Sequence, residues 1–98
     1  MTIEKIQDGR KLTIALEGRL DTTTAPALEE ELKNSLNPVT ELVFDFGRLE
    51  YISSAGLRVL LYANRTMWGK GTMKVINVNE LVQEVFEVTG FSSFLTIE

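Results

Sequence analysis

The chain contains neither cysteine nor histidine. Without cysteine it can form no disulfide bond, carry no thiolate nucleophile and offer none of the sulfur ligands of structural zinc sites. Without histidine it lacks the side chain that most often serves as a general base. A Ser-His-Asp or Cys-His mechanism is therefore excluded. Carboxylates, hydroxyls, lysines and backbone dipoles are the groups left for chemistry.

Long apolar runs and clusters of like charge are missing as well. No apolar run approaches the roughly eighteen residues of a membrane span, and MTIEKIQDGRKL lacks the apolar core of a secretory signal. The formal net charge is −4, without a basic stripe for nucleic acid or a polybasic segment for anionic lipid. We expect a cytoplasmic protein that inserts into no membrane, binds no nucleic acid and has other proteins as its ligands.

Strand patterns occur in four places. In KLTIALEGRL, the residues Leu12, Ile14 and Leu16 fall on one face at period two, and TIEKIQ is a weaker strand joined to it by the turn signal Asp8-Gly9. ELVFDF is nearly continuous in apolar residues, which is typical of a strand covered on both faces. TMKVINV alternates again, and a short final strand in FLTIE completes the set.

Three helices are predicted between these strands. TTTAPALEEELKNSL spaces its leucines by four, with Pro26 near its start. The second helix follows YISS and ends at Gly69-Lys70-Gly71, with Trp68 in the core. The third begins at the N-cap Asn79 and ends at Gly90. The second helix is expected to turn one face to the core, formed by Leu57, Leu60, Leu61, Asn64 and Trp68.

The resulting order is β-β-α-β-α-β-α with an optional last strand. Helices between strands imply right-handed crossovers, so residues 1–98 are expected to form one α/β domain in which helices pack against a mixed sheet. In such sheets, functional groups gather beyond the carboxyl ends of the strands. Asp45 and Ser54 are both predicted near the end of the ELVFDF strand.

The stretch YISSAGLRVLL allows three interpretations of Ser53-Ser54. A serine before a helix commonly caps it by accepting a hydrogen bond from a free backbone N–H. The same free N–H groups and the positive end of the helix dipole could instead hold a phosphate added to a serine. A serine nucleophile is the third interpretation, and it fails because no histidine or neighbouring lysine can act as the base.

The segments GRLDTTTA and DFGRLEYISSAGLRVLL resemble the STAS domain family, more narrowly the small bacterial anti-sigma factor antagonists. Their shared pattern is an aspartate, a short hydrophobic stretch, then a serine, a small residue and Gly-Leu at a helix start. The resemblance implies partner switching. In that family the unmodified protein binds an anti-sigma factor that is also a serine kinase, and this frees a sigma factor. Phosphorylation releases the antagonist, and a serine phosphatase restores it.

The resemblance also implies roles for individual residues. By position, Ser54 is the phosphoacceptor and Ser53, which replaces the family's usual acid, is the second candidate. The protein is then a ligand and a substrate, not an enzyme, with no cofactor, catalytic residue or metal site. The implied partner-binding residues are Asp21, Thr22, Thr24, Asp45, Ser53, Ala55, Gly56, Leu57, Arg58, Val59 and Tyr62.

Two other functions remain open. Some STAS proteins are scaffolds that are not phosphorylated, such as the small subunit that braces the ATPase of a lipid-transport ABC system. A small-ligand or nucleotide-binding domain that uses the Ser54 helix end is the third possibility, although no glycine-rich phosphate loop is present.

Overall fold

A computed structural model describes residues 1–98 and contains four strands, three α-helices and one 3-10 turn. The strands run in the spatial order β1-β2-β3-β4, with β1 antiparallel to β2 and the other pairs parallel. The predicted α/β fold with a mixed sheet is therefore confirmed. The elements are β1 (Thr2–Asp8), β2 (Lys11–Leu20), α1 (Ala25–Ser35), β3 (Glu41–Ile52), α2 (Ser54–Met67), β4 (Thr72–Ile76), α3 (Glu80–Val88) and η1 (Phe91–Ser93).

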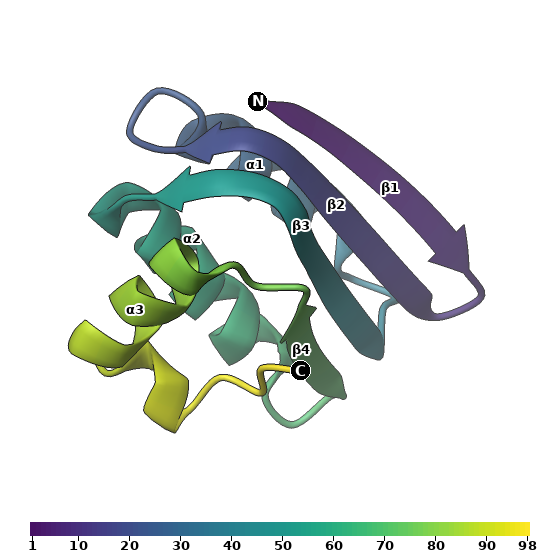
Figure 1. The fold of residues 1–98 in the computed structure, drawn as a ribbon. Helices are drawn as coiled ribbons and strands as arrows, with labels where there is room; N and C mark the ends of the chain where they lie inside the picture. The colour runs from purple at the N-terminus through teal and green to yellow at the C-terminus, as the bar shows by residue number, and fades with distance from the viewer.

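The core lies on one side of the sheet. Figure 1 shows α1 and α2 behind the curved strands, with β1 at one edge. Leu12 and Ile14 of β2 pair in register with Leu42 and Phe44 of β3, and all four are at most 1% exposed. The period-two alternation of β2 thus places its apolar residues under the helices, as predicted. No helix has the length and apolar character needed to cross a bilayer.

β3 is longer than the ELVFDF segment and is covered by helices on one face only. Its pairing with β2 shifts between Ala15 and Glu17 and again after Gly18, and continues to Ile52. Val43 points to the face without helices and is still only 3% exposed, because Thr13 and Lys74 lie beside it in register. Val43 is thus buried on the second face as the apolar run predicted, but by cross-strand neighbours in place of a helix.

The C-terminal segment does not form the predicted strand FLTIE. Residues Phe91–Ser93 are a 3-10 turn, and the tail pairs with β4 through the single β-bridge Val75–Ile97. The tail nevertheless lies along the β4 edge. The N–H of Val75 donates to the carbonyl of Thr96 at 2.9 Å, and the N–H of Glu98 donates to the carbonyl of Val75 at 2.9 Å.

The buried face of α2 differs from the predicted one. Leu57 and Leu60 are buried as expected, but Val59 is also buried at 4% and Trp68 is 82% exposed. The N–H of Trp68 still donates to the carbonyl of Asn64 at 3.0 Å, so Trp68 follows the helical period although the helix ends at Met67. The buried face instead runs through Leu60, Ala63 and Met67 and leaves Trp68 outside it, so its predicted core position is wrong.

Asn79 holds the start of α3, as predicted. Its side-chain oxygen accepts a hydrogen bond from the N–H of Val82 at 2.8 Å, and its amide nitrogen donates to the carbonyl of Leu49 on β3 at 2.9 Å. One side chain thus caps the helix and ties it to the sheet. At the other end, Gly90 has a φ of 82°, the left-handed conformation that ends helices.

Replacing this cap gives a stability prediction. We expect Asn79→Ala to lower the free energy of unfolding by about 1–2 kcal/mol, because a cap bond and a bond to the sheet are both lost. Asn79→Asp keeps the capping acceptor and should lose less. Urea unfolding measures both variants. Asn34→Ala, at an exposed position of α1, is the control, and an equal loss in this variant would contradict the role of the cap.

Candidate functional site

Ser53 and Ser54 lie at the junction between β3 and α2. The N–H of Ser53 donates to the carbonyl of Leu20 at 2.9 Å, so Ser53 still belongs to the sheet. Its backbone is extended, with φ −101° and ψ 178°, and Ser54 is the first helical residue. The Oγ of Ser53 is buried without a hydrogen-bond partner and makes no capping bond. The capping interpretation is therefore wrong for Ser53, whereas Ser54 is exposed to solvent.

The first turn of α2 presents free backbone donors. The first hydrogen bond of this turn runs from the N–H of Leu57 to the carbonyl of Ser53 at 2.9 Å. The N–H groups of Ser54, Ala55 and Gly56 precede it and have no partner within the helix. No acidic residue occupies this turn. The helix end therefore offers donors and the positive end of the dipole beside an exposed hydroxyl, an environment that favours an anion.

Gly56 allows this turn to lie directly on the sheet. A Cβ atom on Gly56 would come within 2.7 Å of Cγ of Leu20 and 2.8 Å of Cγ1 of Ile52. Both side chains are at most 1% exposed and have little room to move. The glycine is thus required by close packing against β2 and β3, and this contact positions Ser54.

Asp21 organises the loop between β2 and α1. Its Oδ1 accepts hydrogen bonds from the N–H of Thr23 at 3.0 Å and from the hydroxyl of Thr23 at 2.7 Å. Thr24 uses its hydroxyl to accept from the N–H of Asp21 at 2.8 Å and to donate to the carbonyl of Arg19 at 2.9 Å. Leu20 pairs with Ile52, so the residues that follow, Asp21 and Ser53, lie on neighbouring chain segments.

The hydrogen bond from the Thr23 hydroxyl, with further bonds from the Thr23 and Thr24 backbone, lowers the pKa of Asp21 from its usual value of 3.8. A carboxylate whose pKa is lowered in the folded protein stabilises the fold at pH values above its usual pKa. This contribution is lost as the pH falls through the folded-state pKa.

We therefore expect Asp21→Asn to be less stable than the unmodified protein at pH 7. The difference should shrink as the pH falls below 3.8 and through the lower folded-state pKa, where the native carboxylate becomes protonated. Denaturant titrations at several pH values test this. Asp8→Asn, at the exposed end of β1, is the control for the loss of one surface carboxylate. A gap between Asp21→Asn and the unmodified protein that is constant with pH would contradict the explanation.

A groove between α1 and α2 brings four of the predicted partner-binding residues together. It has a volume of about 280 Å³, and Ala55, Arg58 and Val59 form its α2 side. Thr22, from the Asp21 loop, also lines it. The α1 side of the groove consists of Ala25, Pro26 and Glu29. These residues were not predicted as contact residues, although the helical spacing of α1 places them on neighbouring turns.

Not every predicted contact residue is accessible. Gly56 is buried, and Leu57 and Val59 are only 6% and 4% exposed. Val59 reaches the groove as part of its floor, while Leu57 lies in the core and holds α2 in place. Tyr62 is half-buried on the same helix, two turns beyond Ser54.

Asp45 lies far from Ser54, contrary to the prediction. β3 continues for seven residues beyond it, to Ile52, so the strand separates the two by roughly 20 Å. Oδ1 of Asp45 accepts hydrogen bonds from the N–H of Gly47 at 2.9 Å and from Nδ2 of Asn77 at 3.1 Å. The predicted strand ended too early, because the apolar pattern stops at Phe46 while the backbone pairing continues.

The chain is similar to known proteins over nearly its whole length. A family model described as "Mlab, STAS domain" matches residues 3–96. BtrV of Bordetella bronchiseptica, a proposed anti-sigma factor antagonist, is 39% identical over 99 residues, which cover 99% of this chain and 84% of BtrV.

Solved structures share the fold. The anti-sigma factor antagonist SpoIIAA in its unphosphorylated form has a TM-score of 0.79 at 18% identity, over 99% of this chain and 87% of that one. An antagonist from Mycobacterium paratuberculosis has a TM-score of 0.87 at 20% identity, over 98% and 83%. Bacillus SpoIIAA in its phosphorylated form has a TM-score of 0.78 at 19% identity, over 99% and 91%. The resemblance predicted from GRLDTTTA and YISSAGLRVLL is confirmed by the family match: the chain belongs to the STAS domain family.

Proposed function

We propose that this protein is an anti-sigma factor antagonist controlled by phosphorylation of Ser54. Its unphosphorylated form binds an anti-sigma factor that is also a serine kinase, and a sigma factor is freed. Phosphorylation ends the complex, and a serine phosphatase restores the binding form. The protein itself acts as ligand and substrate, in the cytoplasm, without a cofactor. The name of BtrV and the likeness to SpoIIAA support this proposal.

The observation that carries the proposal is the exposed Ser54 hydroxyl beside the free N–H groups of Ala55 and Gly56. A phosphate on this hydroxyl adds close to two negative charges, which the helix end accommodates. The same charges would stand next to Ala55, which lines the α1–α2 groove, where the unmodified surface offers a neutral hydroxyl. A partner fitted to the neutral surface would lose contacts there, while the fold remains intact.

Ser54 is favoured over Ser53 by accessibility. A kinase must bring the acceptor oxygen next to the terminal phosphate of ATP, and the Oγ of Ser53 is buried. Ser54 is exposed and needs no unfolding of the β3–α2 junction. We therefore propose Ser54 as the acceptor, with the groove residues Thr22, Ala55, Arg58 and Val59 and the Asp21 loop in the partner interface.

The test is phosphorylation of the purified chain by its anti-sigma factor kinase with Mg²⁺ and ATP, followed by localisation of the phosphate by mass spectrometry. We expect modification of Ser54 and none in Ser54→Ala. Modification only elsewhere, or none, would contradict the proposal. A stable complex with a transporter ATPase in place of the kinase would favour the scaffold function. Nucleotide binding by the isolated chain would favour a nucleotide-binding domain.

A further inference from the structure

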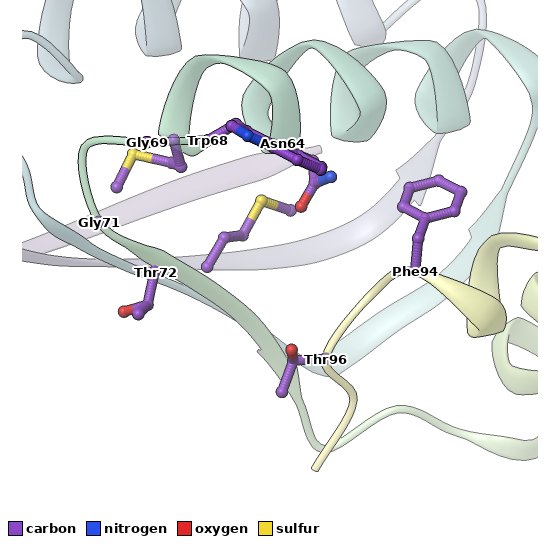
Figure 2. A pocket seen from close by; sticks show the side chains of 9 residues that line it. Asn64, Trp68, Gly69, Gly71, Thr72, Phe94 and Thr96 are labelled. Atoms are coloured by element: carbon purple, nitrogen blue, oxygen red, sulfur yellow. The ribbon is translucent and has the colours of Figure 1, made fainter.

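The end of α2 opposite Ser54 carries an aromatic side chain in an unusual position. Trp68 is the only tryptophan of the chain and is 82% exposed, and Phe94 of the C-terminal segment is 43% exposed. Figure 2 shows the two approaching one pocket from different elements. Large aromatic residues at protein surfaces are enriched at the centres of interfaces. Trp68 and Phe94 therefore mark a candidate binding surface.

The pocket between these residues is apolar at its base. It has a volume of about 310 Å³, and its buried lining residues are Met67 and Met73, which are 1% and 8% exposed. No charged residue lines it. Thioether side chains adapt to different apolar shapes, so this base suits an inserted aliphatic or aromatic side chain.

The β4 edge next to the pocket has unpaired backbone groups. The N–H of Thr72 donates to Thr40 on the β3 side, at 2.9 Å, so the alternation of a strand turns the N–H and C=O of Met73 to the opposite edge. On that edge the tail pairs with Val75 through Thr96 and Glu98, and it makes no backbone hydrogen bond to Met73. The N–H and C=O of Met73 are therefore left for one pair of backbone hydrogen bonds from an inserted segment.

The charge near this edge favours a segment that carries acidic residues. Lys74 on β4 already pairs with Glu98 of the tail, and Lys70 donates to the carbonyls of Leu36 and Asn37, so neither is free for a partner. Arg65 precedes Trp68 by three residues on α2, is exposed and forms no ion pair. A partner that covers Trp68 thus meets an unopposed guanidinium, which carboxylates complement.

We propose that the pocket of Trp68, Phe94, Met67 and Met73 docks an extended acidic segment of a partner protein. An apolar side chain of this segment enters the pocket, its backbone pairs with Met73, and a neighbouring carboxylate binds Arg65. This surface is separated from Ser54 by the fourteen residues of α2, on the order of 20 Å. The inference does not rest on the proposed antagonist function.

Trp68 itself reports on occupation of the pocket. We expect an octapeptide that alternates leucine and glutamate to shift the Trp68 fluorescence to shorter wavelength in a saturable way. The analogue that alternates leucine and lysine should bind at least about tenfold more weakly, because it places cations against Arg65. Hydrogen exchange of the Met73 amide should slow on addition of the acidic peptide, since strand pairing satisfies that N–H.

Matched variants separate the contributions. Arg65→Glu should reverse the preference between the two peptides, whereas Arg10→Glu, in the turn between β1 and β2, should leave it unchanged. Trp68→Ser should abolish binding of a fluorescently labelled acidic peptide, and Leu81→Ser, an exposed apolar position of α3, should not. Because Trp68 is mostly exposed, its replacement should leave urea unfolding nearly unchanged.

Three results would overturn the inference. The first is absence of saturable binding or equal binding of the two peptides. The second is unchanged exchange of the Met73 amide in the presence of the acidic peptide. The third is self-association of the free chain that Trp68→Ser abolishes, which would make a second copy the occupant of the pocket.

Discussion

Ser54→Asp is expected to bind the anti-sigma factor partner at least about a hundredfold more weakly than the unmodified protein, and Ser54→Ala should bind with undiminished affinity. A hundredfold change corresponds to nearly 3 kcal/mol, which the introduction of one charge into a closely fitted interface can supply. The affected atom is the exposed hydroxyl at the start of α2.

This loss should occur without loss of stability. An acidic residue in the first turn of a helix interacts favourably with the free N–H groups and the dipole, so Ser54→Asp should unfold at the same temperature or slightly higher. Calorimetric titration with the partner and thermal unfolding together separate an effect on binding from an effect on folding. Ser54→Ala should also remain bound when the kinase and ATP are present, because it cannot be phosphorylated.

Two control variants sharpen this experiment. Ser92→Asp adds the same charge at an exposed serine of η1 and should leave partner binding unchanged. Ser53→Ala removes a buried hydroxyl that has no hydrogen-bond partner, so the folded protein should be at least as stable and still be phosphorylated. Equal losses of affinity in Ser54→Asp and Ser92→Asp, or loss of phosphorylation in Ser53→Ala, would contradict the role of Ser54.

Gly56→Ala is expected to destabilise the fold by about 1–2 kcal/mol, although alanine is the better helix former. The added Cβ would lie 2.7 Å from Leu20 and 2.8 Å from Ile52, both buried. Overpacking of this kind costs about 1–3 kcal/mol, and the helix propensity of alanine returns at most about 1 kcal/mol. The steric term therefore outweighs the propensity term, and Tm should fall by several degrees.

A double-mutant cycle tests this explanation. Leu20→Ala removes the Leu20 atoms that the new Cβ would meet and leaves the contact with Ile52, so Gly56→Ala should cost less in that background than alone. Gly56→Ala should also weaken partner binding, because the first turn carrying Ser54 must move away from the sheet. If the two substitutions were additive, or if Gly56→Ala were stabilising, close packing would not be the reason for the glycine.

Local signals predicted much of the fold correctly. The alternation of Leu12, Ile14 and Leu16 identified the inner face of β2, and Asp8-Gly9 marked the turn between β1 and β2, where Gly9 has a φ of 63°. Asn79 and Gly90 marked the two ends of α3. Each of these features depends on a few neighbouring residues, whose backbone preferences and polarity are legible in the sequence.

By itself, the sequence determined the element order, the absence of histidine and cysteine chemistry, and the position of Ser54 at a helix start. The tertiary structure alone decided which serine is accessible, that Asp45 lies along β3 away from Ser54, and that Trp68 is exposed. Periodicity along one segment gives the phase of its apolar face. Where a strand stops pairing, or what covers a side chain, depends on segments such as β2 and the C-terminal tail that are distant in sequence and adjacent only in the folded protein.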